Sequence, residues 1–181
     1  MSLKIFIDPH ENIRTPCKDV RLPLNVEDKK LLDEMLTYIE NSQDEKFLET
    51  HPDVTPGIGL AAPQVGVLKK MFVVSVDIDG KRVRYKLVNP KIYSTSTSKI
   101  ALKDGEGCLS IKHKHPGYAH RWYRIKMKAF DALTNKYIDI DAKEFLSIVL
   151  QHENDHLLGR LFYDSIVKDA PFAVLPDEIL I

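Results

Sequence analysis

The chain is poor in cysteine and has no long apolar run. Cys17 and Cys108 are its only cysteines among 181 residues, and one pair gives little support for the disulfide framework of a small secreted protein. Apolar runs extend over only a few residues, whereas a membrane-spanning helix needs about 20. The N-terminal residues MSLKIFIDPH contain no apolar stretch typical of a signal peptide. We therefore expect a soluble, cytoplasmic protein without a membrane partner.

The chain also lacks an excess of charge of either sign. Its 26 Lys and Arg residues balance 26 Asp and Glu residues, so there is no general electrostatic attraction for nucleic acid. Hydrophobic residues make up 44% and charged residues 29%, which is a globular composition. The length suits one domain, which we predict to span residues 1–181.

Hydrophobic periodicity predicts separate groups of helices and strands. An amphipathic helix is expected over residues 26–48, begun by Asn25 or Asp28, and a second helix over about 142–158, with Gly159 as its C-cap. β-branched or alternating residues predict strands at 71–78, 82–93 and 124–133, and the last continues through a turn at Thr134 and Asn135 into a hairpin. Because strands and helices are segregated, we expect an α+β fold.

The segment QHENDHLLG, residues 151–159, contains the pattern His-Glu-x-x-His at His152, Glu153 and His156. Residues four apart on a helix lie on one face, so the two imidazoles can bind the same ion. The same face carries apolar residues at helical spacing, namely Phe145, Ile148 and Val149. A buried neutral imidazole needs partners for its ring nitrogens, and a metal ion supplies one. The pattern therefore favours a metal site over a solvated pair of histidines.

Two histidines seldom hold a catalytic ion, so a third ligand is expected. In the zinc peptidases with an extended motif it would be another histidine, but Phe162 occupies that position, and Glu178 lies near the chain end without a helical context. Cys108, in the segment DGEGCLS, is our candidate, because a metal lowers the pKa of a thiol and makes it a strong ligand. The alternative for Cys108, a small buried core residue, is the commoner role of a free cysteine, and we assign it to Cys17.

The segment GIGLAAPQVG, residues 57–66, combines glycines, small residues and one long polar side chain. It can be read as a core turn, since Gly57 and Gly59 permit unusual backbone angles. Gln64, however, can donate two amide hydrogens, and small neighbours let a substrate backbone approach. Gln64 is therefore a candidate donor to an oxyanion.

The three segments GIGLAAPQ, EGCLS and QHENDH occur in the order and approximate spacing of the peptide deformylase family, which this sequence resembles closely. The segments DPHENIRTPCKDV and LLGRLFYD extend the resemblance over most of the chain. The long stretch at 36–56 and HPGYAHR are more similar to the longer deformylases of Gram-positive bacteria and mycoplasmas. The resemblance implies antiparallel sheets packed around a C-terminal metal-binding helix.

The resemblance also implies an activity, which is removal of the formyl group from the N-terminal formylmethionine of newly made polypeptides. It implies one Fe²⁺ per chain, for which Zn²⁺, Ni²⁺ or Co²⁺ can substitute, a monomer, and a contact with the ribosome. The implied metal ligands are Cys108, His152 and His156, the catalytic groups are Glu153, the Gln64 side chain and the Leu109 backbone N–H, and the substrate-binding residues are Gly59, Phe145, Ile148 and Val149. Two positions depart from the family pattern, since Ile13 replaces a leucine and Asn154 replaces an apolar residue.

Two alternative functions remain at this point. A His-Glu-x-x-His metallopeptidase would cut internal peptide bonds and would need an extended groove for its substrate. A non-enzymatic protein with a closed structural metal site would need a fourth ligand, for which His113, His115 and His120 are the candidates.

Overall fold

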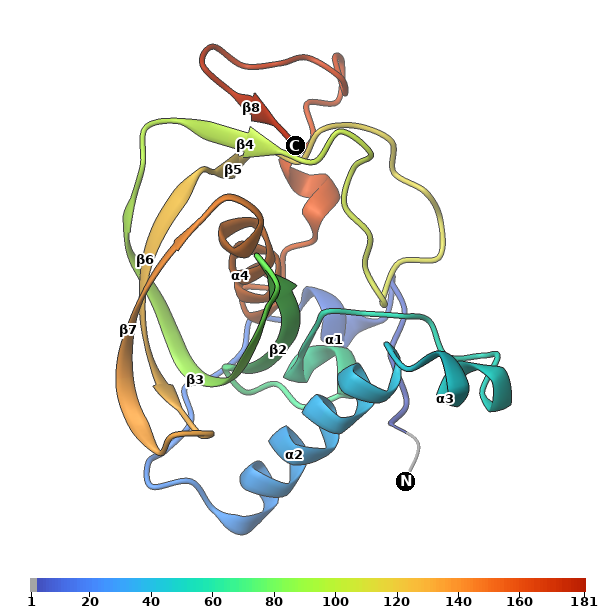
Figure 1. Cartoon of the computed structure of the whole chain (residues 1–181), viewed down its shortest axis with the longest axis vertical. Helices are drawn as coiled ribbons and strands as arrows, with labels where there is room; N and C mark the ends of the chain where they lie inside the picture. The colour runs from blue at the N-terminus through green and yellow to red at the C-terminus, as the bar shows by residue number, and fades with distance from the viewer. Residues whose placement is uncertain (1–2) are drawn as a thin grey trace.

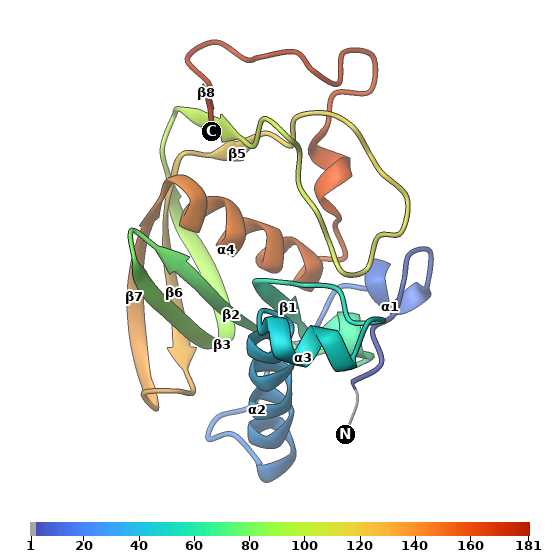
Figure 2. The same ribbon diagram turned by 45° about the vertical axis from the view of Figure 1, so that its right-hand side comes forward.

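The computed structural model describes residues 3–181, so the first two residues of the predicted domain lie outside the described part. Its centre is the helix α4 (Glu144–Leu157), which lies between two β-sheets and a long loop (Figures 1 and 2). The larger sheet is antiparallel, in the order β1 (Gly59–Ala61), β2 (Met71–Ile78), β3 (Lys81–Thr95), β6 (Arg124–Asp131) and β7 (Lys136–Lys143). The smaller sheet has the order β5 (Arg121–Trp122), β4 (Lys99–Ala101) and β8 (Ile179–Leu180).

The remaining helices are short except for α2, which packs against the larger sheet. They are α1 (Glu11–Arg14), α2 (Val26–Asn41), α3 (Glu45–Thr50) and the short 3₁₀ helices η1 (Ala62–Val65) and η2 (Phe162–Ser165). Within residues 3–181, no helix combines the length and apolar character needed to cross a membrane. The α+β class predicted from the sequence is confirmed, as are antiparallel strands around the last long helix.

Strand β2 is apolar along almost its whole length because both of its faces are buried. Phe72, Val74 and Val76 pack in the core beneath α4, whereas Met71 and Val73 pack in a second core beneath α2. A strand buried on two faces loses the polar alternation of a half-exposed strand. The residues of MFVVSVDI therefore place β2 between the helix that carries the histidines and the helix α2.

The hairpin of β6 and β7 matches its prediction closely. Ile125, Met127 and Ala129 are buried on one face, and β6 pairs with β7 from Arg124↔Lys143 to Asp131↔Lys136. At the turn, Asp131 accepts hydrogen bonds from the backbone of residues 133 and 134. Strands β1, β4, β5 and β8 were not predicted, because two- or three-residue strands are too short to show a period.

The prediction of one helix over residues 26–48 is wrong at its C-terminal part. Helix α2 begins after Asn25, whose side chain accepts from the Asp28 N–H, and ends at Asn41. The buried Ser42 then donates to the Ile39 carbonyl, and Asp44 accepts from the backbone N–H groups that begin α3. Polar side chains that bond to the local backbone compete with helical hydrogen bonds, and this separates α2 from α3.

Helix α4 is fixed to its surroundings at its middle and just beyond its C-terminal end. Gln151 accepts from the Trp122 N–H at 2.9 Å and donates to the Trp122 carbonyl at 2.9 Å, which joins the helix to β5. After the helix, Gly159 has φ +69°, and a Cβ atom at this position would lie 2.4 Å from the Arg14 carbonyl oxygen. The predicted C-cap glycine therefore serves both a left-handed turn and a close approach to the N-terminal segment.

We predict that Gly159→Ala destabilises the protein more than Gly80→Ala does. Gly80 has a similar φ of +74°, but a Cβ atom there would have no neighbour within 4 Å, so Gly80→Ala tests backbone strain alone. That strain costs about 1–2 kcal/mol, and steric overlap at Gly159 adds about 1–3 kcal/mol. Urea unfolding of both variants measures the difference in the free energy of unfolding. Equal losses of stability would show that the close approach of Gly159 to Arg14 does not add to the cost of the substitution.

Candidate metal centre

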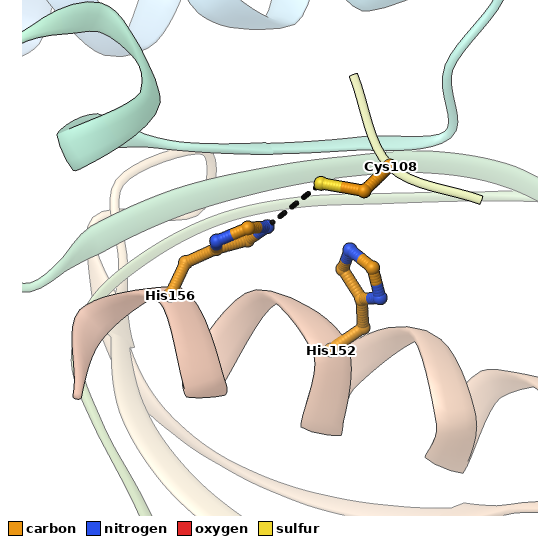
Figure 3. A group of neighbouring side chains, drawn as sticks. All are labelled: Cys108, His152 and His156. Atoms are coloured by element: carbon orange, nitrogen blue, oxygen red, sulfur yellow. Dashed lines mark hydrogen bonds between the residues drawn. The ribbon is translucent and has the colours of Figure 1, made fainter. Parts of the chain in front are cut away.

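Cys108, His152 and His156 form a compact cluster above α4. The two imidazoles project from successive turns of the helix toward Cys108, which approaches on the loop that covers them (Figure 3). One nitrogen or sulfur atom from each residue lies within 4.8 Å of the other two, and Cys108 Sγ is 3.3 Å from His156 Nε2. The fold therefore brings together the three ligands proposed from the sequence.

The cluster has the dimensions and the donor types of a site for a divalent ion. Metal–sulfur and metal–nitrogen bonds of about 2.3 and 2.0 Å in a tetrahedral arrangement place sulfur and nitrogen roughly 3.5 Å apart, close to the observed separation of Cys108 and His156. Among residues 3–181, Cys108, His152 and His156 are the side chains of His, Cys, Asp or Glu that gather in a group of three close enough to hold an ion. One thiolate and two imidazoles leave a tetrahedral ion one further position.

Glu106 supports the cluster from behind, and its side chain is only 4% exposed. Its Oε2 lies 2.7 Å from His152 Nδ1, which turns the other ring nitrogen toward Cys108 (Figure 3). Arg121 donates to both oxygens of Glu106, at 2.7 and 2.9 Å, and also to Asp155 on α4. A carboxylate that orients a metal-binding histidine is a common feature of metal sites and strengthens the ligand.

Burial and charge pairing set the protonation of this network. Burial alone would favour neutral Glu106, but the Arg121 guanidinium and His152 outweigh it and lower the pKa of Glu106 to about 2. Burial would likewise lower the pKa of Arg121, but Glu106 and Asp155 raise it. Both groups are therefore charged near neutral pH, and each compensates the other inside the protein.

The two histidines have opposite electrostatic surroundings. Burial disfavours the charged ring of His152, but Cys108 and Glu106 outweigh burial and raise the pKa of His152. Burial, His152 and Arg121 all lower the pKa of His156, whose Nδ1 is buried without a hydrogen-bond partner in the described residues. A neutral imidazole can ligate a cation, so the surroundings of His156 suit a ligand.

Glu153 is buried beside the cluster and lies at the wall of the adjacent cavity. Burial raises its pKa to about 7, and the attraction of His152 opposes this only partly. Among the described residues, its Oε2 has no hydrogen-bond partner. Gly59 makes room for this carboxylate, because a Cβ atom at Gly59 would lie 2.4 Å from Glu153 Oε1. A carboxyl group with a pKa near neutrality can both accept and deliver a proton.

The side chain of Gln64 approaches the cluster from η1. Its Oε1 accepts from the Ala61 N–H at 2.8 Å, which directs the amide NH₂ toward Ser110 Oγ at 3.1 Å and Cys108 Sγ at 3.6 Å. Gln64 is 1% exposed, so its orientation is fixed by packing as well as by these bonds. The residue that follows Cys108 on the loop, Leu109, lines the same cavity.

A cavity of about 470 Å³ opens beside the cluster. Its wall includes Glu153, His152 and Cys108 together with Gln64 and Leu109. The four residues proposed from the sequence to bind substrate also line it, namely Gly59, Phe145, Ile148 and Val149. Ile148 and Val149 are 2% and 4% exposed, so they belong to the core and also close one side of the cavity.

The residues considered and rejected as ligands have other contacts. Phe162, at the position of the third histidine in the extended motif, stacks on His152 with the ring centroids 6.1 Å apart. Glu178 lies 2.6 Å from His120 Nδ1, and His115 stacks on Tyr163. Neither His115 nor His120 joins the three-residue cluster, and nor does His113.

Sequence reasoning missed Glu106 and Arg121. Glu106 stands two residues before Cys108 in the same motif, and an acid so near a candidate ligand was a usable signal. No sequence signal pointed to Arg121, because its ion pair with Glu106 forms only when the chain folds. Asn154, the departure noted in the helix, lies away from the cluster and lines a separate cavity with Lys91 and Arg160.

The comparisons with known proteins agree with one family. The family model described as polypeptide deformylase matches residues 2–171. Peptide deformylase 2 of Bacillus cereus is 45% identical over 167 residues, which cover 92% of this chain and 89% of that protein. Peptide deformylase of Macrococcus caseolyticus is 40% identical over 179 residues, which cover 98% and 96% of the two chains.

Solved structures give the same result for the fold. Peptide deformylase from Ehrlichia chaffeensis has a TM-score of 0.74 at 29% identity, with 94% of this chain and 91% of that chain covered. A probable peptide deformylase from Synechococcus phage S-SSM7 has a TM-score of 0.72 at 32% identity, with 91% and 100% covered.

We predict that Glu106→Gln weakens metal binding about 10- to 100-fold, because the amide no longer supplies the charge that orients and polarises His152. Glu178→Gln is a matched control, since Glu178 is also buried against the Nδ1 of a histidine, His120, outside the cluster. Competition of each folded variant with a chelator for Zn²⁺ gives the affinity. A similar affinity for both variants would exclude the assigned role of Glu106.

Proposed function

The chain belongs to the polypeptide deformylase family and is an enzyme that removes the formyl group from the N-terminal formylmethionine of newly made polypeptides, and we propose that Cys108, His152 and His156 hold its metal ion. The observation that carries this assignment is the convergence of three ligating atoms within 4.8 Å beside a cavity that also contains Glu153 and Gln64. A bound divalent ion supplies Lewis acidity, which activates water and polarises a carbonyl group.

Glu153 is the proton-transfer group in this proposal. Its carboxylate lies beside the ligands without being one of them, and it is directed into the cavity by the space at Gly59. It accepts the proton of the attacking water and later delivers that proton to the departing amine of methionine. The pKa of about 7 suits both directions of transfer at neutral pH.

Gln64 and the Leu109 backbone N–H donate to the formyl oxygen as it gains negative charge. The position of the Gln64 amide supports this, because its NH₂ group already faces Cys108. Donors of this kind contribute about 2.7–4 kcal/mol each in other oxyanion holes. Phe145, Ile148 and Val149 provide an apolar wall for the methionine side chain, and Gly59 leaves space for the main chain of the substrate.

We further propose that Fe²⁺ is the resident ion, with Zn²⁺, Ni²⁺ or Co²⁺ as substitutes. The donor set suits all four ions, so the preference for iron rests on the resemblance to deformylases. We also propose that the enzyme is a cytoplasmic monomer that acts on nascent chains at the ribosome. One chain supplies every group assigned here, and a formylated N-terminus first becomes accessible as it leaves the ribosome.

The proposed site predicts that a formylated peptide is hydrolysed and an acetylated peptide of the same sequence is not. Gln64, Leu109 and Glu153 line the cavity beside the three candidate ligands, and in the proposed arrangement one additional methyl group would displace the carbonyl from its donors. Initial rates on formyl-Met and acetyl-Met tripeptides, measured with anaerobically prepared protein, provide the test. Cleavage of an internal bond in either peptide would support the metallopeptidase alternative.

Glu153→Ala should retain the ion but lower kcat by about 10²–10⁴-fold, because the carboxylate transfers protons without ligating. Glu144→Ala, on the first turn of the same helix, is the control and should keep wild-type activity. Metal content is measured on the same samples as the rates. Near-normal turnover by metal-loaded Glu153→Ala would show that another group transfers the proton.

A further inference from the structure

Gly57, two residues before β1, is held by side chains and not by the backbone of a neighbouring strand. The Gly57 N–H donates to Ser42 Oγ at 3.1 Å, and the Gly57 carbonyl accepts from Gln43 Nε2 at 2.8 Å. The same Gln43 amide donates to the Ser75 carbonyl on β2 at 2.8 Å. Both polar backbone groups of Gly57 are therefore bound by residues between α2 and α3.

Gln43 is itself held in place from strand β3. Arg82 donates to Gln43 Oε1 and also to Asp77 Oδ2, the latter at 2.7 Å. Because Arg82 occupies the Gln43 oxygen, the Gln43 NH₂ group must face the two carbonyls. We call Ser42, Gln43 and Arg82 the Gly57 clamp.

The position of Gly57 matters for the cavity beside the metal cluster. Gly57, Gly59 and Gln43 line the cavity on one side, and Leu109 lines it as well. Gly57 packs directly against Leu109, because a Cβ atom at Gly57 would lie 2.9 Å from Leu109 Cδ1 and 3.2 Å from Ile39 Cδ1. The clamp therefore sets the spacing between the segment 57–59 and the residue whose N–H faces the formyl oxygen in the proposed function.

The pairing of β1 with β2 does not depend on the clamp. The ladder joins Gly59–Ala61 to Phe72–Val74, and the Ile58 carbonyl accepts from the Ser75 N–H at 2.9 Å. As the first strand of the sheet, β1 has no second strand partner among the described residues, and Gln64 bonds the Ala61 N–H of its outer edge, so the part near Gly59 is the part that an extended peptide can pair with. Loss of the clamp would therefore make the segment at Gly57, which leads into β1, more mobile, while the pairing of β1 with β2 remains intact.

We propose that the Gly57 clamp is a positioning device for the main chain of the formyl-peptide substrate, with Gln43 as its central residue. This inference rests on the proposed function, because the substrate is the one named there. Its members touch the segment that forms the cavity wall and do not contact the three metal ligands. The clamp therefore acts on substrate binding and leaves the chemical step nearly unchanged.

The test uses Gln43→Met and Gln43→Glu in the full-length, metal-loaded enzyme. Methionine has a similar length without hydrogen bonds, and glutamate keeps an acceptor for Arg82 but loses the amide donor. We expect both to raise KM for a formyl-Met tripeptide about 10-fold, with kcat within about twofold of wild type and unchanged metal content. Arg82→Ala, which keeps the Gln43 side chain but removes the donor that orients it, should raise KM about threefold.

Arg124→Ala is the matched control, because Arg124 forms an exposed ion pair with Asp141 on the hairpin, as Arg82 does with Asp77. It should change neither KM nor kcat. Amide hydrogen exchange without substrate should be faster at Gly57 and Ile58 in the Gln43 variants and unchanged in Arg124→Ala. This readout separates a loosened segment from a general loss of stability.

An unchanged KM in the folded Gln43 variants, or a fall in kcat at constant KM, would overturn the proposal. If Gln43→Met does not fold, Gln43→Glu and Arg82→Ala decide the result by the same criteria. Failure of the wild-type enzyme to hydrolyse the formyl peptide would contradict the proposed function instead. The exchange measurement would then still report whether the clamp holds Gly57.

Discussion

The buried ion pair of Glu106 and Arg121 is the interaction on which the geometry of the metal cluster depends. It joins three parts of the chain, because Glu106 lies on the loop of Cys108, Arg121 begins β5, and Arg121 also binds Asp155 on α4. Glu106 then fixes the ring of His152. Each charge is tolerated in the interior only because the other is present, so the pair couples the position of the loop to that of the helix.

The two sheets serve this arrangement by enclosing α4 (Figure 1). The larger sheet packs its apolar face against the helix, and Gln151 fixes the helix to β5 of the smaller sheet. Strand β1 brings Gly59 next to Glu153, and η1 brings Gln64 next to Cys108. The groups of the site thus come from α4, the edge strand β1, the 3₁₀ helix η1 and the loop of Cys108.

Sequence reasoning predicted the structure correctly where a helical or alternating pattern of residues also carried the functional or core side chains. His152 and His156 lie on one face because of helical spacing, and the alternation of Ile125, Met127 and Ala129 fixed the inner face of β6. Cys108 was the candidate third ligand from its motif, but its alternative as a buried core residue stayed open until the resemblance to deformylases was considered. Arg121 and the Gly57 clamp were beyond sequence reasoning, because Glu106 meets Arg121, and Gln43 meets Gly57, only through tertiary contacts. The break after Asn41 was missed because capping by Ser42 and Asp44 outweighed the continued apolar period.

X-ray absorption spectroscopy of anaerobically purified protein, at the edge of the metal it contains, tests the central claim most directly. We expect iron, with one sulfur neighbour at about 2.3 Å and two imidazole nitrogens at about 2.0–2.1 Å, by analogy with thiolate and histidine ligation of similar ions. Glu106→Ala should retain the sulfur neighbour but give disordered nitrogen scattering, because His152 loses its orientation. A first shell made only of oxygen and nitrogen atoms in the wild-type protein would contradict the assignment of Cys108, His152 and His156.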